Sequence, residues 1–133
     1  MHFTRIVRAA LAATLMLAAI QGSARAAASD YEFQLTQAEI SQGDAAVIAV
    51  RLIDKRSGGP VSDAVIFATR LDMAPDGMET MTTKIEALPA TEPGIYRFKA
   101  NLSMEGGWRL SLAAKVQGEA ETVQSELTLK ALP

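Results

Sequence analysis

Hydrophobic and polar residues alternate along much of the chain, which is the pattern of β-strands that bury one face. The alternation is most regular over residues 96–103, 108–117 and 122–131, where only Ser125 interrupts the apolar positions. Less regular runs of the same character occupy residues 31–37, 45–53, 65–73 and 81–88. No stretch sustains a helical period, although residues 36–41 could form one helical turn. The pattern therefore predicts seven strands.

Short clusters that contain glycine, several of them with proline or aspartate, separate these runs. They lie at residues 42–44, 57–60, 74–77, 93–94, 105–107 and 117–118. Short strands at this spacing predict an all-β protein, a seven-stranded antiparallel immunoglobulin-like β-sandwich. A small barrel is the alternative. No internal repeat or second domain is evident in the sequence.

The direction of successive strands predicts which loops share an end of the sandwich. If each strand reverses the direction of the one before, the loop 74–80 and the loop 102–107, which is two strands later, meet at one end. The loops expected together there are 38–43, 74–80 and 102–107.

The N-terminus has the pattern of a secretory signal peptide. Arg5 and Arg8 precede an apolar run over residues 9–20, and Ala24-Arg25-Ala26 offers the small residues at which signal peptidase cleaves. The apolar run is short for a membrane span, although an uncleaved anchor is the alternative. We expect residues 1–26 to be removed and residues 27–133 to form one periplasmic β-sandwich domain that does not insert into the membrane.

Cleavage changes the charge and the available chemistry. Residues 27–133 carry ten Lys and Arg against fifteen Asp and Glu, a net charge of −5, without a basic cluster. Such a chain is not expected to bind nucleic acid or anionic lipid. The chain has no cysteine, and its one histidine, His2, leaves with the signal peptide. With no thiol, no imidazole base and no phosphate-binding glycine motif, we expect no enzyme. The spacing of a calcium loop is also absent.

Methionine is the residue type that suggests a binding site. Four methionines follow residue 26: Met73, Met78, Met81 and Met104. Thioether sulfur is a soft donor that selects Cu(I), so three or four of them could form a trigonal or tetrahedral shell. The carboxylates expected to add negative field nearby are Asp72, Asp76, Glu79 and Glu105. Two alternatives need no metal: methionine as an adaptable core residue, with Met73 the most buried, or as a docking face for a protein.

Trp108 is the largest apolar residue of the chain and stands at the start of a regular run. We expect it to be the central core residue, with Tyr96 and Phe98 packed beside it. The alternative is that Trp108 stacks on a ligand, as in a sandwich that binds carbohydrate or peptide.

Three stretches resemble a known group of proteins. Residues 59–65 (GPVSDAV) are similar to a "G-x-P-V-x-x-A-x-V" type of strand entry, and residues 71–78 (LDMAPDGM) are similar to a methionine-rich loop. Residues 94–98 and 102–110 (GIYRF, LSMEGGWRL) match a "G-x-Y … L-x-M-x-G-x-W-x-L" ending. With these motifs the chain resembles the FixH-like and YtkA-like small exported β-sandwich domains of bacteria.

The resemblance implies an immunoglobulin-like sandwich that handles cations in the periplasm, particularly in copper export or delivery to oxidase assembly. It implies Met73, Met78, Met81 and Met104 as candidate copper ligands, and a membrane transporter, efflux adaptor or oxidase-assembly protein as partner. FixH-type members keep a membrane anchor and many copper-handling relatives carry histidine near the loop, whereas this chain has a signal peptide that we expect to be cleaved and no histidine after His2. The leading hypothesis is a non-enzymatic accessory that binds Cu(I) and passes it on. The alternative is a metal-free interaction module of an efflux or assembly complex.

Overall fold

A computed structural model describes residues 28–133 of the chain. The expected signal peptide, residues 1–26, lies outside the described residues. No helix within residues 28–133 has both the length and the apolar character needed to cross a bilayer.

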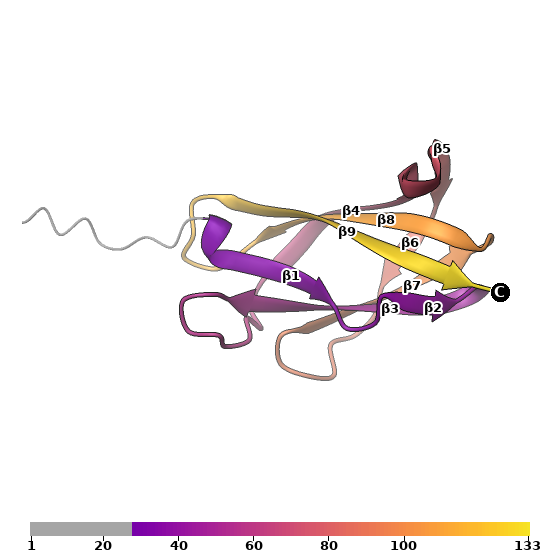
Figure 1. The fold of residues 1–133 in the computed structure, drawn as a ribbon. Coiled ribbons are helices and arrows are strands. Elements are labelled where there is room, and N and C mark those ends of the chain that lie inside the picture. Colours follow the sequence, from indigo (N-terminus) through magenta and orange to yellow (C-terminus); the bar gives the residue numbers. More distant parts are fainter. Residues whose placement is uncertain (1–27) are drawn as a thin grey trace, which may run out of the picture.

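The described chain folds into two β-sheets that face each other, as Figure 1 shows. One sheet has the strand order β1-β3-β7-β6, and the other has the order β2-β9-β8-β4-β5. The elements are η1 (Ala28–Asp30), β1 (Tyr31–Leu35), β2 (Glu39–Ser41), β3 (Gly43–Asp54), β4 (Val65–Met73), η2 (Ala74–Asp76), β5 (Met78–Thr83), β6 (Ile85–Ala87), β7 (Ile95–Leu102), β8 (Gly106–Lys115) and β9 (Thr122–Leu132), where η1 and η2 are single 3₁₀ turns. The predicted all-β sandwich is confirmed.

The strand count and direction differ from the prediction in two places. The run 81–88 divides into β5 and β6, which belong to different sheets, so the chain crosses the sandwich at Lys84. Residues 36–41, which could have formed a helical turn, contain β2 instead, and β2 pairs in parallel with the last residues of β9. The structure therefore has nine strands among residues 28–133 and is not wholly antiparallel. Both differences arise from tertiary hydrogen bonding, which outweighs local pattern in short segments.

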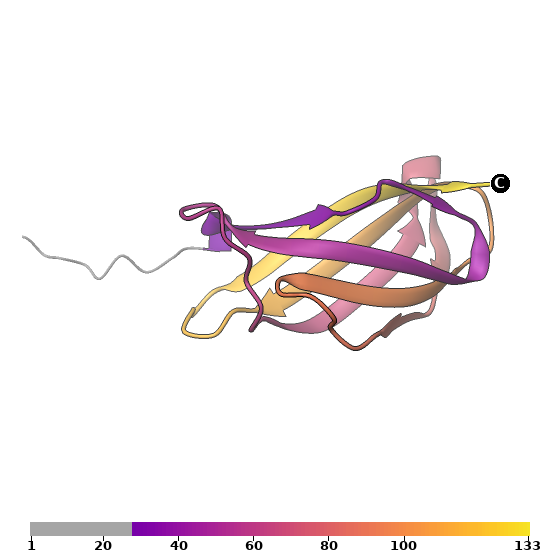
Figure 2. The ribbon, with the colours of Figure 1, turned by 90° about the horizontal axis from the view of Figure 1, so that it is seen from below.

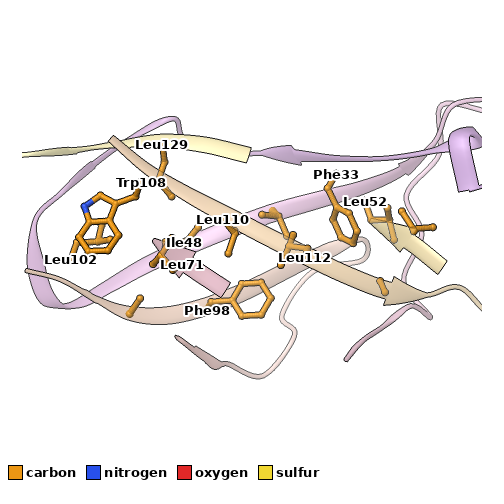
Figure 3. Packing of buried hydrophobic residues seen from close by; sticks show 14 of the residues in the cluster. Phe33, Ile48, Leu52, Leu71, Phe98, Leu102, Trp108, Leu110, Leu112 and Leu129 are labelled. Carbon is orange, nitrogen blue, oxygen red and sulfur yellow. The ribbon is translucent and has the colours of Figure 1, made fainter. Parts of the chain in front are cut away.

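The core lies between the sheets and follows from the alternation in the sequence. The inward positions of β8 bury Trp108, Leu110 and Leu112, and those of β3 bury further aliphatic side chains. Figure 3 shows Trp108 at one end of this cluster and Phe33 toward the other. Trp108 is a core residue, as expected, but it lies at one end of the cluster and not at its centre. Tyr96 does not pack beside it either, because the Tyr96 ring meets that of Phe33 edge-on, with centroids 6.4 Å apart.

The three loops predicted to share one end of the sandwich do so. The Gly107 backbone N–H donates to Asp76 Oδ2 at 3.1 Å, which joins the loop 102–107 to η2. Gly43, at the end of the loop 38–43, is the register partner of Leu102. Figures 1 and 2 place β5, η2 and the C terminus at this end and η1 at the opposite one. We call it the methionine end, defined by the loops 38–43, 74–80 and 102–107.

Candidate functional site

The four methionines differ in how far solvent reaches them. Met73, the last residue of β4, is completely buried. Met78, the first residue of β5, is half-buried against the core and is the register partner of Met73. Met81 within β5 is 37% exposed, and Met104 in the turn between β7 and β8 is 40% exposed. Solvent therefore reaches Met78 and Met104 in the loops of the methionine end and Met81 directly after residue 80, whereas Met73 belongs to the core.

Trp108 holds the turn that carries Met104. The indole Nε1–H of Trp108 donates to the backbone carbonyl of Met104 at 3.0 Å. The indole is completely buried, and a buried donor left without an acceptor would be costly, so this hydrogen bond fixes the turn against the core. The burial also leaves no face of the ring on which a sugar or peptide could stack.

A pair of glycines lets the η2 turn lie against β8. Gly106 has a φ of +128°, and a β-carbon there would overlap the carboxylate of Asp76 and lie 3.2 Å from the Met73 Cε. A β-carbon on Gly107 would lie 2.7 Å from the Pro75 Cβ. Only glycine allows this close approach at both positions. The contact brings the turn that follows Met73 against the start of β8, two residues after Met104.

A buried carboxylate joins three strands beside the methionines. Asp72 of β4 is completely buried, and its Oδ2 accepts hydrogen bonds from Arg70 Nε at 2.9 Å and from Arg109 Nη2 at 3.0 Å. Its Oδ1 accepts from the Ala74 backbone N–H at 2.9 Å. Arg70 Nη2 also donates to the backbone carbonyl of Glu79 at 2.9 Å. Because Arg109 lies on β8 and Glu79 on β5, the cluster fixes both neighbours of β4.

The same contacts set the ionisation of the cluster. Burial acts to raise the pKa of Asp72, but the hydrogen bonds from the Ala74 N–H, from Arg109 and from Arg70 outweigh it, so the pKa lies below its ordinary value. The hydrogen bond to Asp72 in turn raises the pKa of Arg109. Asp72 therefore stays charged and is neutralised by its own arginines. It does not supply the free negative field that the sequence suggested.

Sequence reasoning missed this cluster because its members are distant in the chain. Asp72 and Arg109 are directly opposite each other in the β4–β8 register. The available signal was that two charged residues, Arg70 and Asp72, share one face of a predicted strand, which is unusual beside a buried segment. Among residues 28–133, no group of three or more His, Cys, Asp or Glu side chains is arranged to hold a metal ion.

A broad hollow on the described surface lies away from the methionines. It has a volume of about 540 Å³ on the outer face of β4, β8 and β9. Small side chains such as Ala68, Ser111 and Ala113 line it, together with Arg70 and Glu126. No methionine is among its lining residues, so it is not part of the candidate site.

A model of the YtkA-like family matches residues 25–113. The chain belongs to this family. The match includes all four methionines and the three motifs between residues 59 and 110. It therefore confirms the resemblance to YtkA-like domains, while the copper ligands stay a prediction. The search of curated proteins found no match.

Three solved structures are remotely similar. The filamin domain of Lin-41 is 21% identical, with 80% of this chain and 95% of that chain covered and a TM-score of 0.48. The C-terminal domain of ZirS is 14% identical, with 82% and 70% covered and a TM-score of 0.47. A conjugative transposon lipoprotein from Bacteroides eggerthii is 13% identical, with 75% and 96% covered and a TM-score of 0.34. At these values the similarity carries no functional conclusion.

Proposed function

We propose that this YtkA-like domain is an exported, non-enzymatic accessory that binds Cu(I) through Met78, Met81 and Met104. It passes the ion to a membrane partner, which is an efflux transporter, its adaptor or an oxidase-assembly protein. The observation that carries the proposal is that three partly or well exposed methionines lie on elements joined at one end of the sandwich.

The chemistry of the three side chains suits transfer rather than storage. Thioether sulfur prefers Cu(I) to harder cations. It is also neutral, so the bound ion keeps its charge and is held less tightly than by thiolates. Met81 and Met104 are exposed, so a partner with its own soft ligands can reach the ion from solvent. The Asp76–Gly107 hydrogen bond limits how far the two segments that carry the ligands can separate.

The decisive experiment is an anaerobic Cu(I) titration of the exported chain against a chromogenic competitor. We expect one equivalent to bind, and we expect binding to be lost when Met78, Met81 and Met104 are all replaced by leucine. Met73→Leu is the matched control. It replaces a buried thioether with a side chain of similar size and should leave copper binding unchanged. Absence of stoichiometric binding, or equal binding by the triple variant, refutes the proposal.

A second candidate function is a metal-free docking module, which the exposure of Met81 and Met104 also supports. The two are separated by capturing the membrane partner in the presence and absence of a Cu(I) chelator. If the domain delivers copper, capture of the partner should weaken when the chelator removes Cu(I). Capture that is equally strong with the chelator, and is lost in the triple leucine variant, supports docking alone.

A further inference from the structure

The first six residues of β4 form an open strand edge. On one side β4 pairs with β8 from Val65 to Asp72. On the other side β5 pairs only with residues 71–73, and Thr83 opposite Leu71 is its last residue in the ladder. Within residues 28–133, no strand pairs with residues 65–70 on that side. The edge is therefore a slot six residues long that ends where β5 begins to pair.

This edge carries one irregularity, a register shift between Ile66 and Ala68 in its pairing with β8, but it lacks the other features that usually protect an exposed strand. Val65 is 64% exposed and Phe67 is 56% exposed, and both are large hydrophobic residues. The segment 65–70 contains no proline and no lysine, and Arg70 is its single charged residue. An open, apolar edge of this kind is a template for pairing with another strand.

The interior side of the edge is apolar as well. A hollow of about 150 Å³ lies between Ile66 and the segment that runs from β6 into β7. Its lining includes Leu88, Tyr96 and Phe98. A strand added to β4 would therefore meet apolar side chains on its inner face as well as Val65 and Phe67 on its outer face.

We propose that a second copy of this chain occupies the slot, with the two β4 strands paired antiparallel about a two-fold axis. Opposite residues in such a pair share a face of the sheet. Ile66 and Thr69 lie on the inner face, because their β8 partners Ala114 and Leu112 are buried. Pairing Ile66 with the second copy's Thr69 keeps both on that face. The same register sets Phe67 opposite the second copy's Ala68.

The charges at the two ends of the slot are complementary in this register. Val65 lies opposite the second copy's Arg70, and Asp63 precedes Val65 by two residues. Asp63 lies in the bend before β4 and is exposed, at the end of the slot where the second copy's half-exposed Arg70 lies, so the two-fold axis brings opposite charges together at both ends. The dimer is independent of copper binding.

Sedimentation of the exported chain over a wide range of protein concentration tests the proposal. We expect a reversible dimer, and we expect Phe67→Lys to raise its dissociation constant at least about tenfold, since the two added charges lie one position apart on the paired strands, beside the axis. Asp63→Lys should weaken the dimer by a smaller factor that disappears at high salt. Val47→Lys is the control, because Val47 is an exposed hydrophobic residue of the other sheet and should leave the dimer intact.

Hydrogen exchange localises the contact. Backbone amides within residues 65–70 should become more protected as the dimer forms in the wild-type chain and should not do so in Phe67→Lys. A wild-type chain that stays monomeric at every concentration overturns the proposal. So does a dimer that Phe67→Lys leaves unchanged. A monomer that instead gains protection at residues 65–70 with an extended peptide from another protein assigns the edge to that protein.

Discussion

At the scale of single residues, Asp72 joins the candidate site to the fold. It is completely buried and accepts hydrogen bonds from two arginines and one backbone N–H. Asp72 directly precedes Met73. The outer face of β4 is therefore fixed by the hydrogen bonds of Asp72, and the inner face by the packing of Met73 in the core. The ion cluster therefore sets the position of the β4–β5 connection.

Asp72→Asn should destabilise the domain by about 2 kcal/mol at neutral pH, because both arginines lose a charged acceptor. The depressed pKa of Asp72 fixes the sign of the pH dependence. The unfolded chain takes up the proton at a pH near 4, before the folded chain does, so the stabilisation is complete above that pH and is lost as the pH falls further. Urea unfolding at several pH values should show the difference between the variant and the wild type shrinking in acid. The exposed Asp44→Asn is the control, and a loss of stability as large as that of Asp72→Asn would contradict the assigned role.

Glycine is required at Gly77 for its backbone conformation alone, and at Gly106 for both its backbone conformation and the lack of space for a side chain. Both have positive φ, but a β-carbon on Gly77 would meet nothing within 4 Å, whereas one on Gly106 would overlap the Asp76 carboxylate. Gly77→Ala should cost only the backbone strain, about 1 kcal/mol. Gly106→Ala should cost about 2–3 kcal/mol, because steric overlap adds to that strain. Equal costs in urea unfolding would show that η2 does not press on β8.

At the scale of elements, alternation in the sequence predicted the strands that belong to the core. The runs 96–103, 108–117 and 122–131 correspond to β7, β8 and β9, because each buries every second side chain over many residues. The crossing at Lys84 was not predictable, since both sides of it have the same local character. β2 was missed because its three residues gain their pairing from β9, about ninety positions away.

The candidate site was predictable only in part, for a related reason. Strand parity placed the methionine loops at one end, and that required nothing beyond strand direction. Which thioethers stay accessible depends on packing: Met73 continues the inward face of β4, whereas Met104 lies in a turn. The role of Asp76 depends on a contact between η2 and β8 that no local pattern encodes.

Asp76→Ala tests how far that contact organises the methionine end. Loss of its hydrogen bond to the Gly107 N–H should cost about 1 kcal/mol of stability. We expect weaker Cu(I) binding as well, although all three proposed ligands remain, because the η2–β5 segment is freed from the Met104 turn. Glu105→Ala is the matched control: it removes a negative charge from the same end without removing an observed contact. If both variants weaken binding equally, negative charge rather than the contact with Gly107 is what matters.

At the scale of the whole molecule, the predicted cleavage after Ala26 stays a prediction, and Ala28 is the first residue that the structure describes. The Ala28 backbone N–H donates to a Glu121 carboxylate oxygen at 2.9 Å, and Ala28 packs partly against the core. Cleavage after Ala26 leaves this contact intact. We expect the intact mass of the exported protein to correspond to a chain that begins at Ala27. A full-length mass recovered with the membrane fraction would instead show the uncleaved anchor.

The two proposed surfaces of the molecule should function independently. The methionine end lies beyond the C-terminal end of β4, whereas the open edge occupies its first six residues. Antiparallel pairing of two β4 strands points the two methionine ends in opposite directions, so neither covers the other. Phe67→Lys should therefore bind one Cu(I) per chain with the affinity of the wild type, while it no longer dimerises. A copper stoichiometry that falls by half in the wild-type dimer, and recovers in Phe67→Lys, would show that the methionines of two chains share one ion.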